Sequence, residues 1–189
     1  MILTPDNEYA AVLDACVLYP MPLCDTLLRL ASEPSFYRPL WSEQILHEVG
    51  ETMEKQGYSK EQRERRLVVM REFFPEALVD VPEEIIKAVS TLPDLKDCHV
   101  LAAAILSNAN AIVTQNTKHF PQKCLEKYGI LCQSADDFLI HQYHLGPGQI
   151  LGKLDEQAAN NKEERSCLVA NLAKAVPKFA ELVASDNPG

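Results

Sequence analysis

The chain has 189 residues, 47% of them hydrophobic, which is enough for one compact domain and a smaller extension. Its net charge of −9 argues against a broad, non-specific nucleic-acid surface, because such surfaces are usually basic, but it allows a small acidic site that holds cations against phosphate. The sequence shows neither a signal peptide nor an apolar run of about 18 residues, so we expect a cytoplasmic protein without a membrane span.

Short apolar runs alternate with helix-like stretches along most of the chain. Ser42 is expected to cap the helix over 41–52, and in the helix over 59–74 we expect an inward-facing set of Leu67, Val68, Met70, Phe73 and Phe74. Strands are predicted over 9–13, 77–81, 111–114 and 130–132. Further helices are predicted over 25–31, 83–89, 97–107, 121–127 and 134–143. Strands separated by helices predict an α/β fold, with a mostly parallel sheet between two helical layers.

Gly146-Pro147-Gly148 marks an expected boundary between a domain over 1–145 and a helical extension over 146–189. Two helical segments follow, 147–160 and 163–184, and Pro177 should kink or restart the second. That second segment carries an apolar stripe, formed by Leu168, Leu172, Phe179 and Val183. We expect the stripe to pack on the first domain, on a second copy of the chain or on a partner protein.

Four oxygen-bearing side chains stand at strand ends and on helices. Asp14 follows the strand over 9–13, Asn116 follows the strand over 111–114, Glu48 lies on a helix and Asp97 opens another helix. Carboxylate and amide oxygens gathered at the carboxyl ends of parallel strands are suitable ligands for Mg²⁺. The pattern indicates a metal site that acts on phosphate esters.

Each of these acids also has an ordinary interpretation. Asp14 could form a turn or cap a helix, Glu48 could lie on an exposed helix face, and Asp97 could interact with the helix dipole. The helix after Asp97 is almost wholly apolar, so we expect Asp97 to lie where a buried helix leaves the sheet. An acid in such a place is not explained by solvation alone, which favours a functional role. For Asp94 we favour a helix N-cap over a metal ligand, and we expect His99 to pack or hydrogen-bond inside the sheet–helix layer.

One stretch of the chain gathers basic residues among glutamates, namely Lys60, Arg63, Arg65, Arg66 and Arg71. A solvated helix face with Glu–Arg pairs four residues apart is favoured over an RNA-contacting patch. The six cysteines are widely spaced, so we expect free thiols.

Several of these stretches resemble the motifs of PIN-domain ribonucleases, in the branch that includes VapC-like toxins. The string VLDACVL at 12–18 is similar to the first-strand motif, and LPDLKDCHVLAAA at 92–104 is similar to the central acidic motif in its His-containing form. IVTQNTKHFP at 112–121 resembles the third motif, and residues 128–130 and 134–139 fit the ending. The resemblance covers about residues 8–143.

This resemblance implies a three-layer α/β/α sandwich and an endoribonuclease dependent on Mg²⁺ or Mn²⁺. Many bacterial members are toxins paired with an antitoxin, so RNA is the implied substrate, and the implied partners are an antitoxin or a second copy of the chain. Matching the motifs implies the catalytic residues Asp14, Glu48, Asp97 and Asn116, with Asp14, Asp97 and Asn116 on the metal and Glu48 acting through water.

The sequence departs from the family pattern at the third motif. Many members have Asp where this chain has Asn116, and an acid often stands at the position of His119. An Asn carbonyl can ligate a hard cation but adds no charge. Two other hypotheses therefore accompany the toxin: a catalytically impaired PIN fold that serves as a binding module, and an RNA- or DNA-processing nuclease without an antitoxin.

Overall fold

The centre of the protein is a five-stranded parallel sheet. The structure is a computed structural model that describes residues 9–89 and 91–186. The strands lie in the order β3-β2-β1-β4-β5, and all four neighbouring pairs are parallel. Their bounds are β1 Ala10–Leu13, β2 Arg38–Ser42, β3 Leu78–Val79, β4 Ala111–Val113 and β5 Leu131–Gln133. The parallel sheet expected from the sequence is confirmed.

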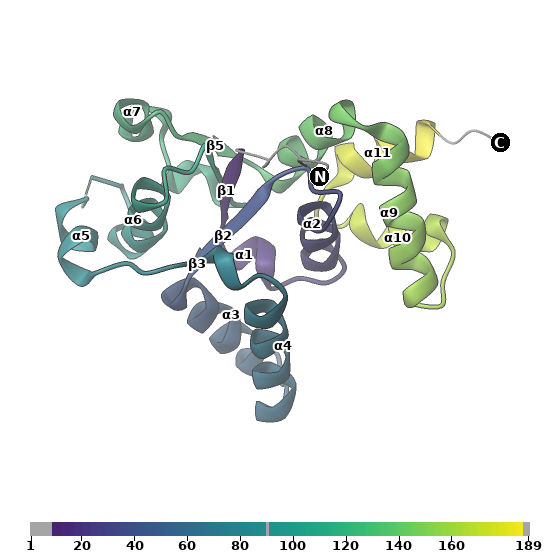
Figure 1. The fold of residues 1–189 in the computed structure, drawn as a ribbon, viewed down its shortest axis with the longest axis horizontal. Helices are drawn as coiled ribbons and strands as arrows, with labels where there is room; N and C mark the ends of the chain where they lie inside the picture. The colour runs from purple at the N-terminus through teal and green to yellow at the C-terminus, as the bar shows by residue number, and fades with distance from the viewer. Residues whose placement is uncertain (1–8, 90, 187–189) are drawn as a thin grey trace, which may run out of the picture.

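Helices cover the sheet on both sides, which completes the α/β/α sandwich. In Figure 1, α5 and α6 lie on one side of the strands, and α2, α8 and the C-terminal helices lie on the other. The α-helices are α1 Ala15–Leu18, α2 Leu23–Ala31, α3 Glu43–Lys55, α4 Lys60–Phe73, α5 Glu83–Ala88, α6 Cys98–Leu106, α7 Gln122–Leu125, α8 Ala135–Leu145, α9 Pro147–Asn160, α10 Arg165–Leu172 and α11 Pro177–Ser185. Short 3₁₀ turns are η1 Pro75–Ala77, η2 Leu95–Asp97, η3 Thr117–His119 and η4 Glu126–Tyr128. None of the described helices is long and apolar enough to cross a membrane.

Strand β2 is an element that the sequence reading missed. Proline is unusual inside a strand because it cannot donate to the ladder, so the sequence around Pro39 does not predict a strand. In the structure Pro39 pairs with Ala11 of β1 on one side. On its other side β3 pairs only with Trp41 and Ser42, so no strand faces Pro39 there. Its missing N–H therefore leaves no ladder bond unmade.

Helix α4 buries less than its sequence predicts. Ser59 caps it through a complete capping box, as the start of the predicted helix requires. Of its expected inward-facing residues Met70 is fully buried, whereas Val68 and Phe73 are 46% and 75% exposed. The expectation was wrong for these two, because α4 packs mainly on α3 and so buries only a narrow face.

Three of the basic residues of α4 form ion pairs with glutamates. Arg63 contacts Glu54 of α3 at 3.1 Å and Arg71 contacts Glu43 at 2.6 Å. Lys60 pairs with Glu64 within α4, four residues along. The expected pairing four residues apart is confirmed for Lys60 with Glu64. It is wrong for Arg63 and Arg71, because their glutamate partners belong to α3.

The C-terminal helices are fastened to the rest of the chain by buried polar contacts. Thr26 of α2 donates to the Gln157 side chain of α9 at 2.8 Å, and both residues are fully buried. Asp136 of α8 accepts hydrogen bonds from the backbone N–H groups of Phe179 and Lys178 at 2.7 and 3.1 Å. Pro177 begins α11, so the expected restart of the helix is confirmed.

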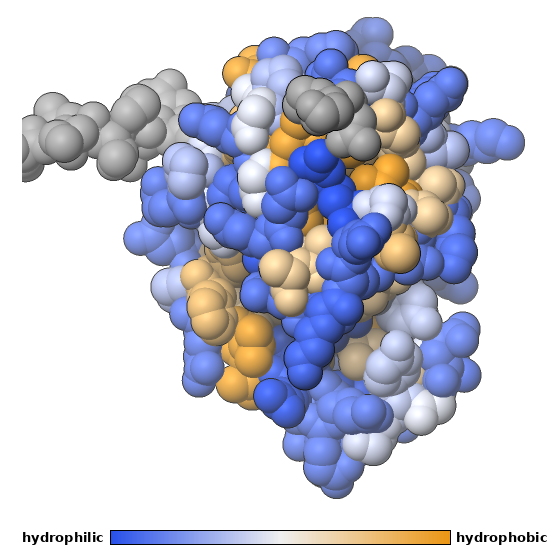
Figure 2. Space-filling model, turned by 90° about the vertical axis from the view of Figure 1, so that its right-hand side faces the viewer, coloured by the Kyte–Doolittle hydropathy of each residue, from blue (hydrophilic) through white to orange (hydrophobic). Residues whose placement is uncertain are grey.

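The apolar stripe of the extension packs within its own chain. Leu168, Leu172 and Phe179 have no exposed surface, and Val183 is 3% exposed. Seen from the side of these helices, the surface is mainly hydrophilic with small apolar patches (Figure 2). Whether 146–189 forms a separate domain stays a prediction.

The Asp136 contacts generate the first prediction. Asp136→Ala should lower the free energy of unfolding by about 2 kcal/mol, because it leaves two backbone N–H groups at the start of α11 without their charged acceptor. Urea denaturation measures the change. The neighbouring Asp137 is the matched control: it pairs with Lys178 in solvent, so Asp137→Ala should cost less than about 1 kcal/mol. Equal losses would show that the Asp136 contacts do not hold α11.

Candidate metal centre

Asp14 is held at the carboxyl end of the sheet by the strand beside it. Its Oδ2 accepts a hydrogen bond from Thr114 Oγ1 at 2.6 Å and another from Cys16 Sγ at 3.1 Å. The parallel register pairs Leu13 with Val113, so the residue after each strand meets the other across the sheet edge. Asp14 is 6% exposed, and its side chain makes no cap bond to α1, which excludes the helix-cap interpretation.

Asp97 lies where the apolar helix α6 leaves the sheet, at the end of η2. Its Oδ2 lies 2.7 Å from His119 Nδ1, and its side chain is 20% exposed. Burial raises the pKa of Asp97, the hydrogen bond with His119 lowers it, and the charges of Asp14 and Asp94 raise it further, with a net upward shift. Asp14 therefore lies near enough for its charge to contribute to the upward shift of the Asp97 pKa.

Asp94 caps η2, because its Oδ1 accepts a hydrogen bond from the Lys96 backbone N–H at 3.0 Å. The expected N-cap is therefore confirmed. The cap does not remove Asp94 from the site: ligand atoms of Asp94, Asp97 and His119 all lie within 4.8 Å of one another. These three side chains come from two segments, the approach to α6 and the turn after β4.

Glu48 reaches the same region from α3. Its Oε1 lies 2.9 Å from Nε2 of His99, which belongs to the first turn of α6 and has a side chain only 2% exposed. His99 therefore packs inside the sheet–helix layer, as expected. Glu48 is 34% exposed, so it lies partly at the surface, but one of its oxygens also lies beside a buried partner.

Asn116 is held beside Thr114 and His119 by hydrogen bonds of its backbone. Its N–H donates to Thr114 Oγ1 at 3.0 Å, and its carbonyl accepts from the His119 N–H at 2.9 Å. The residue is exposed, and none of the hydrogen bonds found in the described ranges involves its side-chain amide. The role of the Asn116 amide as a metal ligand therefore stays a prediction.

Sequence reasoning missed Thr114, Cys16 and His119 as parts of the site. Thr114 could have been found by the same signal as Asp14, since both directly follow a buried strand. His119 was noticed only as a departure from the family's acid. The contact between His119 and Asp97 depends on the conformation of the turn η3, and no sequence pattern predicts that turn.

The site carries uncompensated negative charge. Within residues 9–89 and 91–186, neither Lys nor Arg forms an ion pair with Asp14, Asp94 or Asp97, and His119 is the one ion-pair partner found for the three. Burial, then the charge of Asp14, raises the pKa of Cys16 to about 12 and that of Cys132 to about 11. An oxygen-rich cluster of this charge fits a divalent cation.

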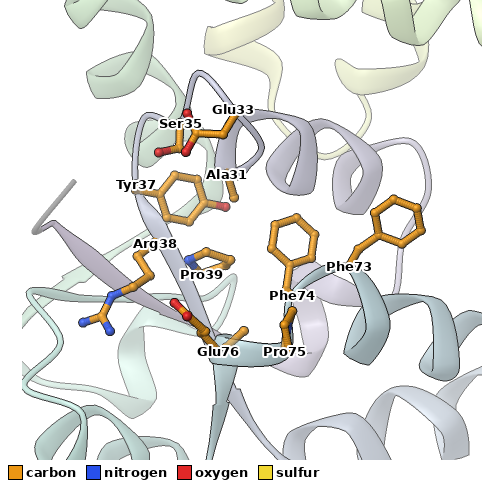
Figure 3. Close-up of a pocket in the computed structure, with 11 residues that line it drawn as sticks. Ala31, Glu33, Ser35, Tyr37, Arg38, Pro39, Phe73, Phe74, Pro75 and Glu76 are labelled. Carbon is orange, nitrogen blue, oxygen red and sulfur yellow. The ribbon is translucent and has the colours of Figure 1, made fainter. Parts of the chain in front are cut away.

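The cavity drawn in Figure 3 lies elsewhere, near the start of β2. It has a volume of about 630 Å³ and is lined by Tyr37, Arg38, Phe73, Phe74 and Glu76, among others, and by none of the acids of the metal centre. The acids lie instead near the carboxyl ends of the strands, where Asp14 is 6% exposed and the Asp97 side chain is 20% exposed.

The fold and the acidic edge define a PIN domain, and the chain belongs to the PIN domain family, whose model matches residues 10–118. The resemblance found in the motifs is thereby confirmed. A 43% identical relative over 89 residues is the Mycobacterium tuberculosis (strain ATCC 25618 / H37Rv) protein named "Putative ribonuclease VapC50". That match covers 45% of this chain and 52% of the relative, so the chain spans about half the length of the curated relative it matches. No solved structure matches significantly.

The raised pKa of Asp97 generates a prediction on pH. A carboxyl whose pKa is higher in the folded than in the unfolded protein destabilises the fold when it ionises. That destabilisation is complete above the folded-state pKa and vanishes as pH falls toward the unfolded value of about 3.9. In EDTA, Asp97→Asn should unfold at a higher temperature than the wild type at about pH 8, and the difference should shrink toward about pH 4.

Asp155→Asn is the control for this experiment, because Asp155 is an exposed acid of α9 paired with Arg165. It should show no such pH-dependent gain. A stability difference for Asp97→Asn that is absent, or that stays constant across this pH range, would contradict the prediction.

Proposed function

We propose that this protein is a divalent-metal-dependent endoribonuclease that cleaves RNA phosphodiester bonds and serves as the toxin of a toxin–antitoxin pair. The observation that carries the proposal is the cluster of Asp94, Asp97 and His119, whose ligand atoms lie within 4.8 Å of one another. Asp14 follows β1, and none of the three carboxylates has a Lys or Arg counter-ion among the described residues. Membership of the PIN domain family and a relative named as a ribonuclease support the same chemistry.

Asp14 and Asp97 would hold Mg²⁺ or Mn²⁺, with Asn116 contributing its amide oxygen and Glu48 acting through water. His119 adds a candidate nitrogen ligand, because its Nδ1 lies beside Asp97. A cation held there supplies a Lewis acid that activates water and neutralises charge on the scissile phosphate.

The surrounding residues would orient these ligands. Thr114 and Cys16 donate to Oδ2 of Asp14, which fixes the carboxylate and leaves Oδ1 free to ligate. The raised pKa of Cys16 keeps its thiol protonated and therefore a donor. Glu48 is anchored through Oε1, so Oε2 can accept a hydrogen bond from a water near the phosphate.

The partners follow from the same assignment. RNA is the proposed substrate, and a cognate antitoxin is the proposed protein partner, with self-association as a homodimer and a cytoplasmic location as further parts of the proposal. The alternative of an impaired binding module is favoured by one observation, the exposed Asn116 amide without a partner in the described ranges. Cleavage assays distinguish it from the nuclease.

The third prediction tests the chemistry. Purified protein should cleave RNA with Mn²⁺ or Mg²⁺ and not with EDTA, and Asp14→Asn should lower the rate by about a hundredfold or more, because it removes a charged ligand. Asp155→Asn, on exposed α9, should cleave at the wild-type rate. Cleavage that persists in EDTA, or an active Asp14→Asn variant, would refute the metal mechanism. A binding module would bind RNA without cleaving it.

Expression of the same variants in cells tests the toxin assignment. The wild type should arrest growth, Asp14→Asn should not, and mapping of cellular RNA ends should show cleavage only with the wild type. RNA cleavage without growth arrest would instead favour a processing nuclease without an antitoxin.

The fourth prediction concerns the residue that replaces an acid of the family. Imidazole nitrogen suits Mn²⁺ better than Mg²⁺, whereas carboxylates suit both hard ions. His119→Asp should therefore strengthen Mg²⁺ binding, and His119→Ala should weaken Mn²⁺ binding by about tenfold. Isothermal titration of metal into EDTA-treated protein measures both affinities. Unchanged Mn²⁺ affinity in His119→Ala would exclude His119 as a ligand.

A further inference from the structure

His99 is a buried polar residue on an otherwise apolar helix. It lies in the first turn of α6, two residues after Asp97, and the residues that follow it, Val100 and Leu101, are fully buried. Its Nε2 lies 2.9 Å from Oε1 of Glu48. Its Nδ1 is buried without a hydrogen-bond partner.

This geometry selects one form of the imidazole. A hydrogen on Nδ1 would be a buried donor without an acceptor, which is strongly unfavourable. A bare Nε2 would place its lone pair against a carboxylate oxygen. The form that best suits the contacts carries its hydrogen on Nε2, which lies 2.9 Å from Oε1 of Glu48, and leaves only the Nδ1 lone pair unpaired.

The contact is hard to explain by stability alone. An apolar side chain at position 99 would pack in this layer without burying an unpaired nitrogen. Glu48 is 34% exposed, so water could satisfy its carboxylate. On the same helix Glu51 has partners of the ordinary kind, His47 and Lys55, both of which lie in solvent.

We propose that His99 is a positioning residue for the metal centre. Its Nε2–H holds Oε1 of Glu48 at the start of α6, the end of the helix that carries Asp97, so that Oε2 can accept hydrogen bonds from the hydration shell of the cation. The inference rests on the proposed metal-dependent function, and it assigns to His99 an effect that acts only through Glu48.

Two substitutions of His99 by amide side chains, glutamine and asparagine, test where the hydrogen-bond donor must lie. The Nε2 of a glutamine reaches about as far as the Nε2 of histidine, whereas the shorter asparagine amide does not reach Glu48. Titration of Mn²⁺ into EDTA-treated protein should give His99→Gln an affinity within about threefold of the wild type. His99→Asn should bind about tenfold more weakly, as is typical of residues that orient metal ligands. Equal affinities for the two amide variants would overturn the proposal.

A double-mutant cycle tests whether the effect passes through Glu48. Glu48→Ala should weaken Mn²⁺ binding by about as much as His99→Asn, and the double variant should be no weaker than Glu48→Ala alone. Additive losses would overturn the proposal, because His99 would then act independently of Glu48. Glu51→Ala is the control on the same helix and should leave Mn²⁺ affinity unchanged.

Thermal unfolding without metal separates positioning from folding. A merely structural role predicts loss of melting temperature in His99→Asn with unchanged Mn²⁺ affinity of the folded protein, which would refute the proposal. RNA cleavage is scored separately. His99-dependent Mn²⁺ binding in a protein that cleaves no RNA would refute the proposed nuclease while supporting the positioning role of His99.

Discussion

The parallel pairing of β1 with β4 is the constraint on which the metal centre depends. It sets Leu13 beside Val113, and so it brings Asp14 and Thr114 to one point at the end of the sheet. Thr114 Oγ1 then serves two partners, donating to Asp14 and accepting from the backbone N–H of Asn116. A slip of one residue in this register would turn each strand's side chains to the opposite face and separate these groups. The sheet therefore fixes how Asp14 and Thr114 lie relative to each other.

The same edge concentrates charge that the fold does not neutralise. Asp14 is satisfied by hydrogen bonds from neutral donors, and Asp97 by His119, so the local polar groups are paired while the negative charge remains. The raised pKa of Asp97 reflects the energetic cost of keeping this negative charge without a Lys or Arg partner. A protein optimised for stability alone would place a lysine or arginine there. The unneutralised carboxylates are instead what a cation requires, and the buried layer around β1, β4 and α6 provides the stability that offsets them.

Sequence reasoning reached Asp14 and Asp97 because a physical rule places them: acids after buried strands, or before a buried helix, gather at the carboxyl edge of a parallel sheet. It placed β1, β4 and the Ser42 cap for similarly local reasons. It failed at β2 because Pro39 is tolerated only where the neighbouring strand is short, which is a tertiary fact. It failed for Phe73 because the exposure of that residue depends on how much of α4 meets α3. The contact between His119 and Asp97 depends on a 3₁₀ turn with no signature of its own.

The region matched by the family model is shorter than the structural unit that carries the acidic edge, and the C-terminal part accounts for the difference. The matched region ends at residue 118, one position before His119 and before β5, α8 and the later helices. Yet β5 completes the sheet against β4, and α8 holds α11 through Asp136. Buried contacts from Thr26 to Gln157 tie α9 back to α2, so the last helices are joined to the first third of the chain. The part beyond the match thus packs against the scaffold that carries the acidic edge and contributes none of the acids Asp14, Glu48, Asp94 and Asp97.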